Sequence, residues 1–266
     1  MQPVIKWSGS KRSQSEMIKS FLPDSFGTYY EPFIGGGSML YAINPEKAIC
    51  GDICESLIKL WKEIRDHPFI VAEEYRKRWA KLQEEGSSIY YIIRDNFNKT
   101  KSPYDLMFLS RTCTNGLIRF NSKGEFNNSF HFSRKGINPD SLKRIIVDWS
   151  NHIQNVDFTA TDYIVTTSSA KTGDIIYLDP PYFHTKGMYY GNIDFDKFLN
   201  YLEDLNNRNI KYILSYDGKR DSKDCTVDIP NTLYKRHEFI FSGNSSFKRI
   251  FSKENEKVFE SIYLNY

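Results

Sequence analysis

The chain has 266 residues, of which 40% are hydrophobic and 26% charged, a balance typical of a globular protein with one or two domains. It has no apolar stretch long enough to span a bilayer, and its first residues lack the apolar segment of a signal peptide, so we expect a cytoplasmic protein. The net charge is +3, but residues 99–144 hold nine Lys or Arg and three acids. Such a basic segment fits a polyanion-binding face or an ordinary solvated surface.

The four cysteines and five histidines form no metal-binding pattern. Only Cys50 and Cys54 are close in sequence, and no histidine stands beside them at the spacing of zinc ligands. We therefore expect reduced, mostly buried thiols and no bound metal.

Short apolar runs predict β-strands, and helical patterns alternate with several of them. The predicted strands are residues 28–33, 47–52, 156–161, 174–179, 210–216, 236–241 and 259–266. Apolar residues recur at helical spacing after Asp52 and after Asp194. This alternation indicates an α/β fold with a mostly parallel sheet. The last two runs have no helix between them and predict a hairpin at one edge of the sheet.

The alternation breaks between about residues 55 and 150, where the chain is helical, polar and rich in Tyr, Trp and Arg. Ser102 and Pro103 have the residue types of a helix N-cap and of the first helical position. Residues 119–133, RFNSKGEFNNSFHFS, indicate a hairpin or a loop. We expect residues 55–149 to form an inserted subdomain, with 1–54 and 150–266 together forming the main domain.

A glycine cluster, EPFIGGGSML at 31–40, follows the first predicted strand and opens a helix. In open α/β sheets ligands bind beyond the carboxyl ends of the strands, and glycine lets the backbone approach them closely. Gly35 and Gly37 fit the dinucleotide pattern G-x-G-x-x-G, but Leu40 takes the place of the third glycine, which disfavours NAD. Asp52 ends the second strand, where a carboxylate can accept both hydroxyls of a ribose. A nucleoside ligand without phosphates, such as S-adenosylmethionine, fits this combination.

Four stretches follow one another along the chain: KWSGSKR (6–12), EPFIGGG (31–37), RTCTNGLIRFNSKGEFN (111–127) and DPPYF (179–183). Over nearly the whole chain they resemble, in this order, the Dam-type or D12-class DNA adenine-N6 methyltransferases. The resemblance implies a Rossmann-like class I S-adenosylmethionine-dependent methyltransferase fold, with a mixed seven-stranded sheet, a C-terminal β-hairpin and an inserted target-recognition domain.

The resemblance also implies the partners of the reaction. S-adenosylmethionine would be the methyl donor, S-adenosylhomocysteine the product, and double-stranded DNA the substrate, without a metal or a membrane. A monomer is expected. A restriction endonuclease would be a functional rather than a physical partner; an orphan or a phage enzyme stays an alternative.

The motif DPPYF has a chemical explanation. The lone pair of adenine's exocyclic amine is conjugated with the ring, so two acceptors on its N–H bonds would free it for attack. The carboxylate of Asp179 and the carbonyl of Pro180 would be these acceptors, Pro181 would stiffen the turn, and Tyr182 would stack on the base, with Phe183 extending that wall. A base in a duplex cannot reach such a pocket, so it must be flipped out. Direct transfer without a covalent intermediate follows.

The resemblance further assigns a cofactor site. The N-terminal motif would contribute Trp7 and Lys11, the glycine cluster would line the methionine portion, and the segment TDY (161–163) would flank the adenine of the cofactor. The implied cofactor residues are Trp7, Lys11, Phe33, Gly35, Gly37, Asp52, Asp162, Tyr163 and Asp179.

A set of DNA-binding residues is implied in the same way: Lys6, Arg111, Asn115, Leu117, Arg119, Lys123 and Ser129. Arg119 is the expected reader of guanine, since Arg binds it bidentately in the major groove. Arg111 and Lys123 are expected to serve phosphates or local packing. The chain departs from the family at Thr114, where an aromatic residue is usual, and at NSFHF (128–132), so the recognition sequence, GATC or another adenine-containing site, stays open.

Two alternatives remain at this point. Methylation of cytosine N4 or of RNA is less compatible with Asp179, because Ser or Asn usually stands before Pro-Pro-Tyr in those enzymes. A catalytically inactive DNA-binding module with the same fold is the alternative of another class, and the intact motif DPPY argues against it.

Overall fold

The structure is a computed structural model, which describes residues 2–133, 135–181, 193–221, 223–244 and 256–266. Its described helices are α1 Ser15–Lys19, α2 Ser38–Ile43, α3 Glu55–Asp66, α4 Pro68–Glu85, α5 Ser88–Thr100, α6 Pro103–Thr112, α7 Pro139–His152, α8 Tyr163–Thr166 and α9 Phe195–Asn207, with a 3-10 turn at Thr114–Gly116. Its described strands are β1 Tyr29–Glu31, β2 Ala48–Gly51, β3 Val156–Thr159, β4 Ile175–Leu178, β5 Lys211–Tyr216, β6 Lys219–Arg220, β7 Lys223–Asp224, β8 Arg236–Asn244 and β9 Lys257–Leu264.

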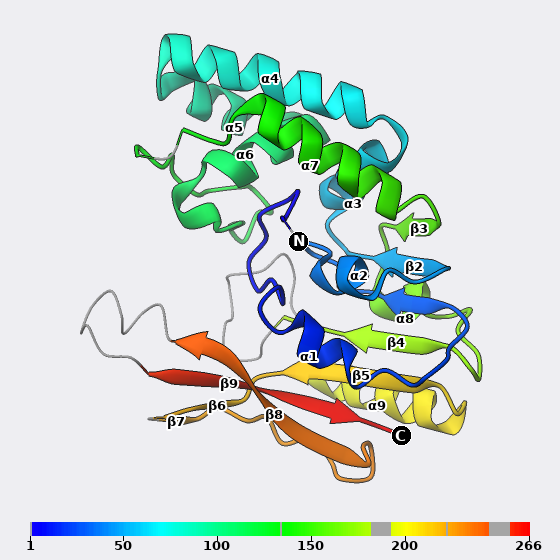
Figure 1. Ribbon diagram of the computed structural model, residues 1–266. Helices are drawn as coiled ribbons and strands as arrows, with labels where there is room; N and C mark the ends of the chain where they lie inside the picture. Colours follow the sequence, from blue (N-terminus) through cyan, green and yellow to red (C-terminus); the bar gives the residue numbers. More distant parts are fainter. Residues whose placement is uncertain (1, 134, 182–192, 222, 245–255) are drawn as a thin grey trace.

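A single sheet runs through the molecule, and helices α4 to α7 form an upper helical layer beyond the β3 edge of the sheet (Figure 1). The strands β3-β2-β1-β4-β5 are parallel, and β9 pairs antiparallel with β5. On β9, Ile262 faces Ser215 of β5 on one side and Glu238 of β8 on the other. The strand β9 therefore lies inside the sheet, and β8 forms its edge.

All seven apolar runs predicted as strands are strands, and the α/β fold with its C-terminal hairpin of β8 and β9 is confirmed. The described sheet has nine strands rather than seven, because β6 and β7, of two residues each, follow β5. The two helices predicted after Asp52 and Asp194 are α3 and α9. Two-residue strands are too short to leave a periodic pattern in the sequence, which explains the difference in number.

Alternating residues of the parallel strands divide the core between the two faces of the sheet. On β4, Ile175 and Tyr177 point to one face, while Ile176 and Leu178 point to the other, as the two-residue period of a strand requires. The buried cluster on the first face continues into helices α1 to α7, and α8 and α9 contribute to the cluster on the second. The sheet is covered on both faces, which the continuous apolar runs of its parallel strands predict.

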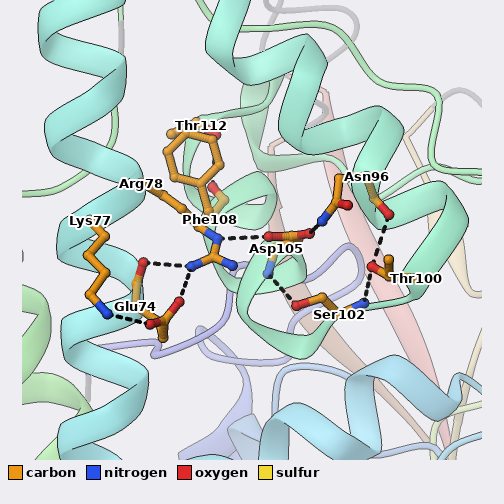
Figure 2. A network of polar contacts seen from close by, with 9 residues as sticks. All are labelled: Glu74, Lys77, Arg78, Asn96, Thr100, Ser102, Asp105, Phe108 and Thr112. Carbon is orange, nitrogen blue, oxygen red and sulfur yellow. Dashed lines mark hydrogen bonds and ion pairs between the residues drawn. The ribbon is translucent and has the colours of Figure 1, made fainter.

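A buried polar network joins three helices of the upper layer (Figure 2). Asp105 of α6 is only 1% exposed, and its carboxylate accepts hydrogen bonds from Arg78 Nε of α4 at 2.7 Å and Asn96 Nδ2 of α5 at 2.5 Å. Arg78 also forms an ion pair with Glu74 at 2.6 Å. The hydroxyl of Ser102 accepts from the amide of Asp105 at 3.4 Å, so the predicted N-cap of this helix is confirmed.

The predicted hairpin or loop at 119–133 contains an antiparallel bridge between Phe120 and Phe126, whose rings pack edge to face. None of the helices within the described ranges is long and apolar enough to cross a bilayer. Helix α7 runs across the boundary predicted at 149/150, and the division into a main domain and an inserted domain stays a prediction.

Candidate active site

A cavity of about 230 Å³ opens at the carboxyl ends of the parallel strands. Residues from the N-terminal segment, the glycine turn, the end of β2, the start of α8 and the end of β4 line it. Every residue predicted to bind the cofactor is among them: Trp7, Lys11, Phe33, Gly35, Gly37, Asp52, Asp162, Tyr163 and Asp179. The structure thus brings together residues that are up to 172 positions apart, and their role in binding a cofactor stays a prediction.

The glycine turn is shaped by the aromatic residues around it. A Cβ atom on Gly35 would lie 2.7 Å from Trp7 Cδ1, and one on Gly37 would lie 3.0 Å from the Trp61 ring. Both glycines have positive φ values, 45° and 68°, which L side chains rarely adopt. The indole of Trp61 donates a hydrogen bond to the carbonyl of Gly35 at 3.1 Å. Only glycine fits at these two positions, and the turn lines the cavity without side chains.

Two backbone amides hold the carboxylate of Asp52 in place. Its carboxylate accepts hydrogen bonds from the amide of Cys54 at 2.9 Å and from the amide of Gly35 at 3.3 Å. Burial raises the pKa of Asp52 to about 6, although these two amides lower it. The group is ionised at neutral pH and can accept further hydrogen bonds from a ligand.

Asp179 forms a buried ion pair with Lys11. The distance from Lys11 Nζ to Asp179 Oδ1 is 2.8 Å, and the side chain of Lys11 is 3% exposed. Burial raises the pKa of Asp179 to about 6, while Lys11 lowers it and Glu260 raises it further. Burial alone would lower the pKa of Lys11, but the charges of Asp179 and Glu260 hold it above its usual value. The lysine therefore stays charged and holds one carboxylate oxygen in place.

Two aromatic residues also line the cavity. Phe33 and Tyr163 stack at 5.5 Å between ring centroids, with an interplanar angle of 29°. Asp162 caps α8, because its carboxylate accepts a hydrogen bond from the amide of Ile164 at 2.8 Å. The cavity is thus lined both by an aromatic pair and by the Lys11–Asp179 ion pair.

Two acidic residues of the site were missed in the sequence. Glu31 lines the cavity, is 3% exposed, and accepts a hydrogen bond from the hydroxyl of Tyr29 at 2.9 Å. Burial raises the pKa of Glu31 to about 8, so the group is mostly neutral at pH 7. The signal for Glu31 was its place at the end of the first strand; Glu260, within the last apolar run, gave no signal of its own.

The structure describes only the first three residues of the predicted motif DPPYF. Asp179, Pro180 and Pro181 line the cavity, directly after β4. Tyr182 and Phe183 lie outside the described residues, so the predicted stacking on a base stays a prediction.

Arg111 differs from the other predicted DNA-binding residues because it is buried. It is 8% exposed, and its guanidinium donates to the carbonyls of Pro3 and Val4. Burial lowers the pKa of Arg111 to about 10. Of the two roles considered, phosphate binding and local packing, the structure shows packing: Arg111 anchors the N-terminal segment against α6. A buried arginine and a DNA-facing one look alike in a basic stretch of sequence.

The other predicted DNA-binding residues lie on or beside one loop. Asn115, Arg119, Lys123 and Ser129 are exposed and Leu117 is half-buried. The stem of Lys6 runs against the same loop, since a Cβ atom on Gly116 would lie 3.0 Å from Lys6 Cδ.

Hydrogen bonds hold this loop in shape. The side-chain amide of Asn128 donates to the carbonyls of Thr114 and Leu117 at 2.9 and 2.8 Å. The hydroxyl of Thr114 donates to the carbonyls of Ser129 and Phe130. The loop is therefore a built surface, and its contact with DNA stays a prediction.

The parallel sheet, the glycine turn after β1 and the acid at the end of β2 define a class I S-adenosylmethionine-dependent methyltransferase fold. More narrowly, the chain belongs to the D12 class of N6 adenine-specific DNA methyltransferases, whose family description matches residues 7–260.

Several curated proteins are similar to this chain. The type II methyltransferase M1.LlaDCHI of Lactococcus lactis is 29% identical over 68% of this chain and 66% of its own length. The type II methyltransferase M.MjaIII of Methanocaldococcus jannaschii is 31% identical over 68% and 69%. The DNA adenine methylase of Serratia marcescens is 30% identical over 67% and 66%. The chain thus spans about two thirds of the length of these relatives.

Proposed function

We propose that the protein transfers a methyl group from S-adenosylmethionine to the N6 amine of a specific adenine in double-stranded DNA. The observation that carries the proposal is one cavity lined by the glycine turn, Asp52 and the Asp179–Pro180 end of β4. Membership of an N6 adenine-specific DNA methyltransferase family supports it. We further propose that it acts as a monomer in the cytoplasm of a bacterial or phage-infected cell, alone or with a restriction endonuclease as functional partner.

The residues of the cavity fit the cofactor. The glycine turn lines the cavity without side chains, the carboxylate of Asp52 can accept hydroxyl donors, and Phe33 and Tyr163 offer an apolar wall for a base. When bound, the cofactor supplies an electrophilic methyl group on a sulfonium. Asp52 would hold the ribose and the turn at Gly35 the methionine portion.

The end of β4 would handle the attacking amine. Lys11 holds Oδ1 of Asp179, so that Oδ2 would accept one amine N–H, and the carbonyl of Pro180 would accept the other. These two acceptors would draw the nitrogen toward sp³ geometry and free its lone pair for in-line attack. We assign Tyr182 to stacking on the flipped base. No nucleophilic side chain is needed for direct transfer.

Transfer of labelled methyl groups to DNA duplexes tests the function. We expect label on adenine N6 in duplexes that contain the recognition site, which long-read sequencing of methylated genomic DNA would identify. Label on cytosine N4, or on RNA alone, would show that adenine in double-stranded DNA is not the substrate. Binding of DNA without any transfer would favour the inactive module instead.

The rate should depend on pH through Asp179. Because burial raises its pKa to about 6, its carboxylate is protonated as the pH falls through that value, and the acceptor is lost. We expect the single-turnover rate to fall about tenfold for each pH unit below about 6. The measurement needs saturating cofactor, since Asp52 also has a pKa of about 6. A rate that stays constant from pH 7.5 to pH 5 would exclude an ionised Asp179 as acceptor.

Arg119 and Lys123 form a matched pair for testing recognition. Both are exposed on the same hairpin, and we assign base reading to Arg119 and phosphate contact to Lys123. Arg119→Ala should lower the preference for the cognate over a non-cognate duplex by about 5- to 150-fold, which corresponds to about 1–3 kcal/mol. Lys123→Ala should weaken binding to every duplex alike and reduce the salt dependence by about one phosphate contact. Competition binding at several salt concentrations measures both, and equal loss on all duplexes for Arg119→Ala would contradict its assignment.

A further inference from the structure

A buried cluster links the last strand of the sheet to Asp179. Lys11 Nζ lies 2.8 Å from Asp179 Oδ1 and 3.6 Å from Glu260 Oε2. Lys11 is 3% exposed, and the side chains of Asp179 and Glu260 are 18% and 12% exposed. Glu260 lies on β9, in a register that places it on the same face as Ile262 and Leu264, the face that the N-terminal segment covers. One buried cation thus lies between a carboxylate that directly follows β4 and a carboxylate of β9.

Glu260 is itself held in position. Its Oε2 accepts a hydrogen bond from Ser215 Oγ of β5 at 3.3 Å, and its Oε1 accepts one from Gln14 Nε2 at 3.4 Å. Ser215 is fully buried, and Gln14 is 5% exposed. Both carboxylate oxygens are therefore engaged by neutral donors, which fix the side chain without neutralising its charge.

Burying the charge of Glu260 costs free energy that an apolar side chain at the same position would not cost. An ionised carboxylate in a protein interior is stabilised only by a nearby cation and good hydrogen bonds, and replacing such a pair with apolar residues often leaves stability unchanged or raises it. Asp179 alone would suffice as counterion for Lys11, since the two are in direct contact. The second carboxylate therefore needs a reason other than neutralising the lysine.

We propose that Glu260 is a positioning residue for methyl transfer: through Lys11 it sets the place and the acceptor strength of the Asp179 carboxylate. Held on one side by Glu260 and on the other by Asp179, the ammonium keeps its place beside Oδ1 of Asp179. Because Lys11 shares its charge between two carboxylates, Asp179 keeps more electron density for an amine N–H than it would in an isolated ion pair. This role rests on the proposed methylation of adenine.

The ionisable groups around the pair agree with this role. Among the described residues they come from β1 (Glu31), β4 (Tyr177) and β9 (Glu260). Glu31 is mostly neutral at pH 7, and Tyr177 acts on Lys11. Glu260 raises the pKa of Asp179, whereas Lys11 lowers it. Removing the charge of Glu260 should therefore lower the pKa of Asp179.

The test compares Glu260→Gln, Glu260→Asp and Glu238→Gln. Glu238 is the matched control, since it lies on the neighbouring strand β8 and pairs with Arg236. In single-turnover assays at saturating cofactor, Glu260→Gln should lower the rate by about 10- to 100-fold, the loss expected of a misplaced reacting group. The pH below which its rate begins to fall should also be lower than in the wild type. Glu260→Asp should keep the wild-type pH dependence, and Glu238→Gln should change neither quantity.

A second measurement needs no turnover. A ¹³C NMR titration of the Asp179 carboxyl should give a lower midpoint in Glu260→Gln than in the wild type and the Glu238→Gln control. An unchanged midpoint, or a Glu260→Gln rate within about twofold of the wild type, would overturn the positioning role. A wild-type protein that methylates no adenine would instead overturn the proposed function, and the titration would still test the link between Glu260 and Asp179.

Discussion

Replacing Asp179 with alanine should abolish methyl transfer while leaving cofactor binding nearly intact. The carboxylate is the proposed acceptor for an amine N–H, and loss of a group that acts in the transition state costs about 10² to 10⁴-fold in rate. The fold should survive, because Lys11 keeps Glu260 as a partner at 3.6 Å. Single-turnover assays with labelled cofactor, together with calorimetric cofactor titrations, measure the two effects separately.

Asp52→Ala is the matched control for this variant. Asp52 is an acid of the same cavity with a similarly raised pKa, but we assign it to the ribose. It should weaken cofactor binding and leave the rate at saturating cofactor much less affected. Full methylation by Asp179→Ala would rule out the mechanism proposed for the end of β4.

Replacing Asp105 with leucine should destabilise the protein by about 3 to 5 kcal/mol. The change removes a carboxylate that is 1% exposed and leaves Arg78 and Asn96 without their acceptor in the interior of the helical layer (Figure 2). Because Arg78 keeps its ion pair with Glu74 at 2.6 Å, the loss of stability should be nearer to about 3 than to about 5 kcal/mol. Chemical denaturation, followed by circular dichroism, gives the free energy of unfolding.

Asp95→Ala provides the control for Asp105. The side chain of Asp95 on α5 is 63% exposed, and its Oδ1 lies 3.6 Å from Nη2 of Arg94. Removing this exposed ion pair should lower the free energy of unfolding by at most about 1 kcal/mol. An Asp105→Leu variant as stable as Asp95→Ala would show that the buried network contributes little. Replacing Arg78 as well with methionine should recover part of the loss, because no uncompensated charge then remains.

Much of the fold could be predicted because its strands are buried on both faces and leave continuous apolar runs. The site was predictable for a related reason: its residues directly follow these runs, at the edge where parallel strands end. Asp52 and Asp179 occupy equivalent positions after β2 and β4, and the family resemblance supplied their roles.

Other features depend on pairings that the sequence does not encode locally. Glu260 reaches Lys11 only because β9 inserts antiparallel beside β5, and no periodicity reveals which strand will be its neighbour. Arg111 was predicted to face DNA or to pack, and its contact with the carbonyls of Pro3 and Val4 decides for packing. In both cases the partner lies more than 100 positions away in the chain.

The position of β9 inside the sheet has a consequence for how the protein folds. Until residues 257–264 have been synthesised, β5 carries a bare edge of unpaired amides and carbonyls, although the parallel strands before it are complete. Such an edge can pair with another chain, and contacts between distant segments form slowly. Nascent or refolding chains should therefore be most prone to aggregate in the interval before this strand inserts. Lys11 and Glu260, 249 positions apart, can meet only at the end of that process.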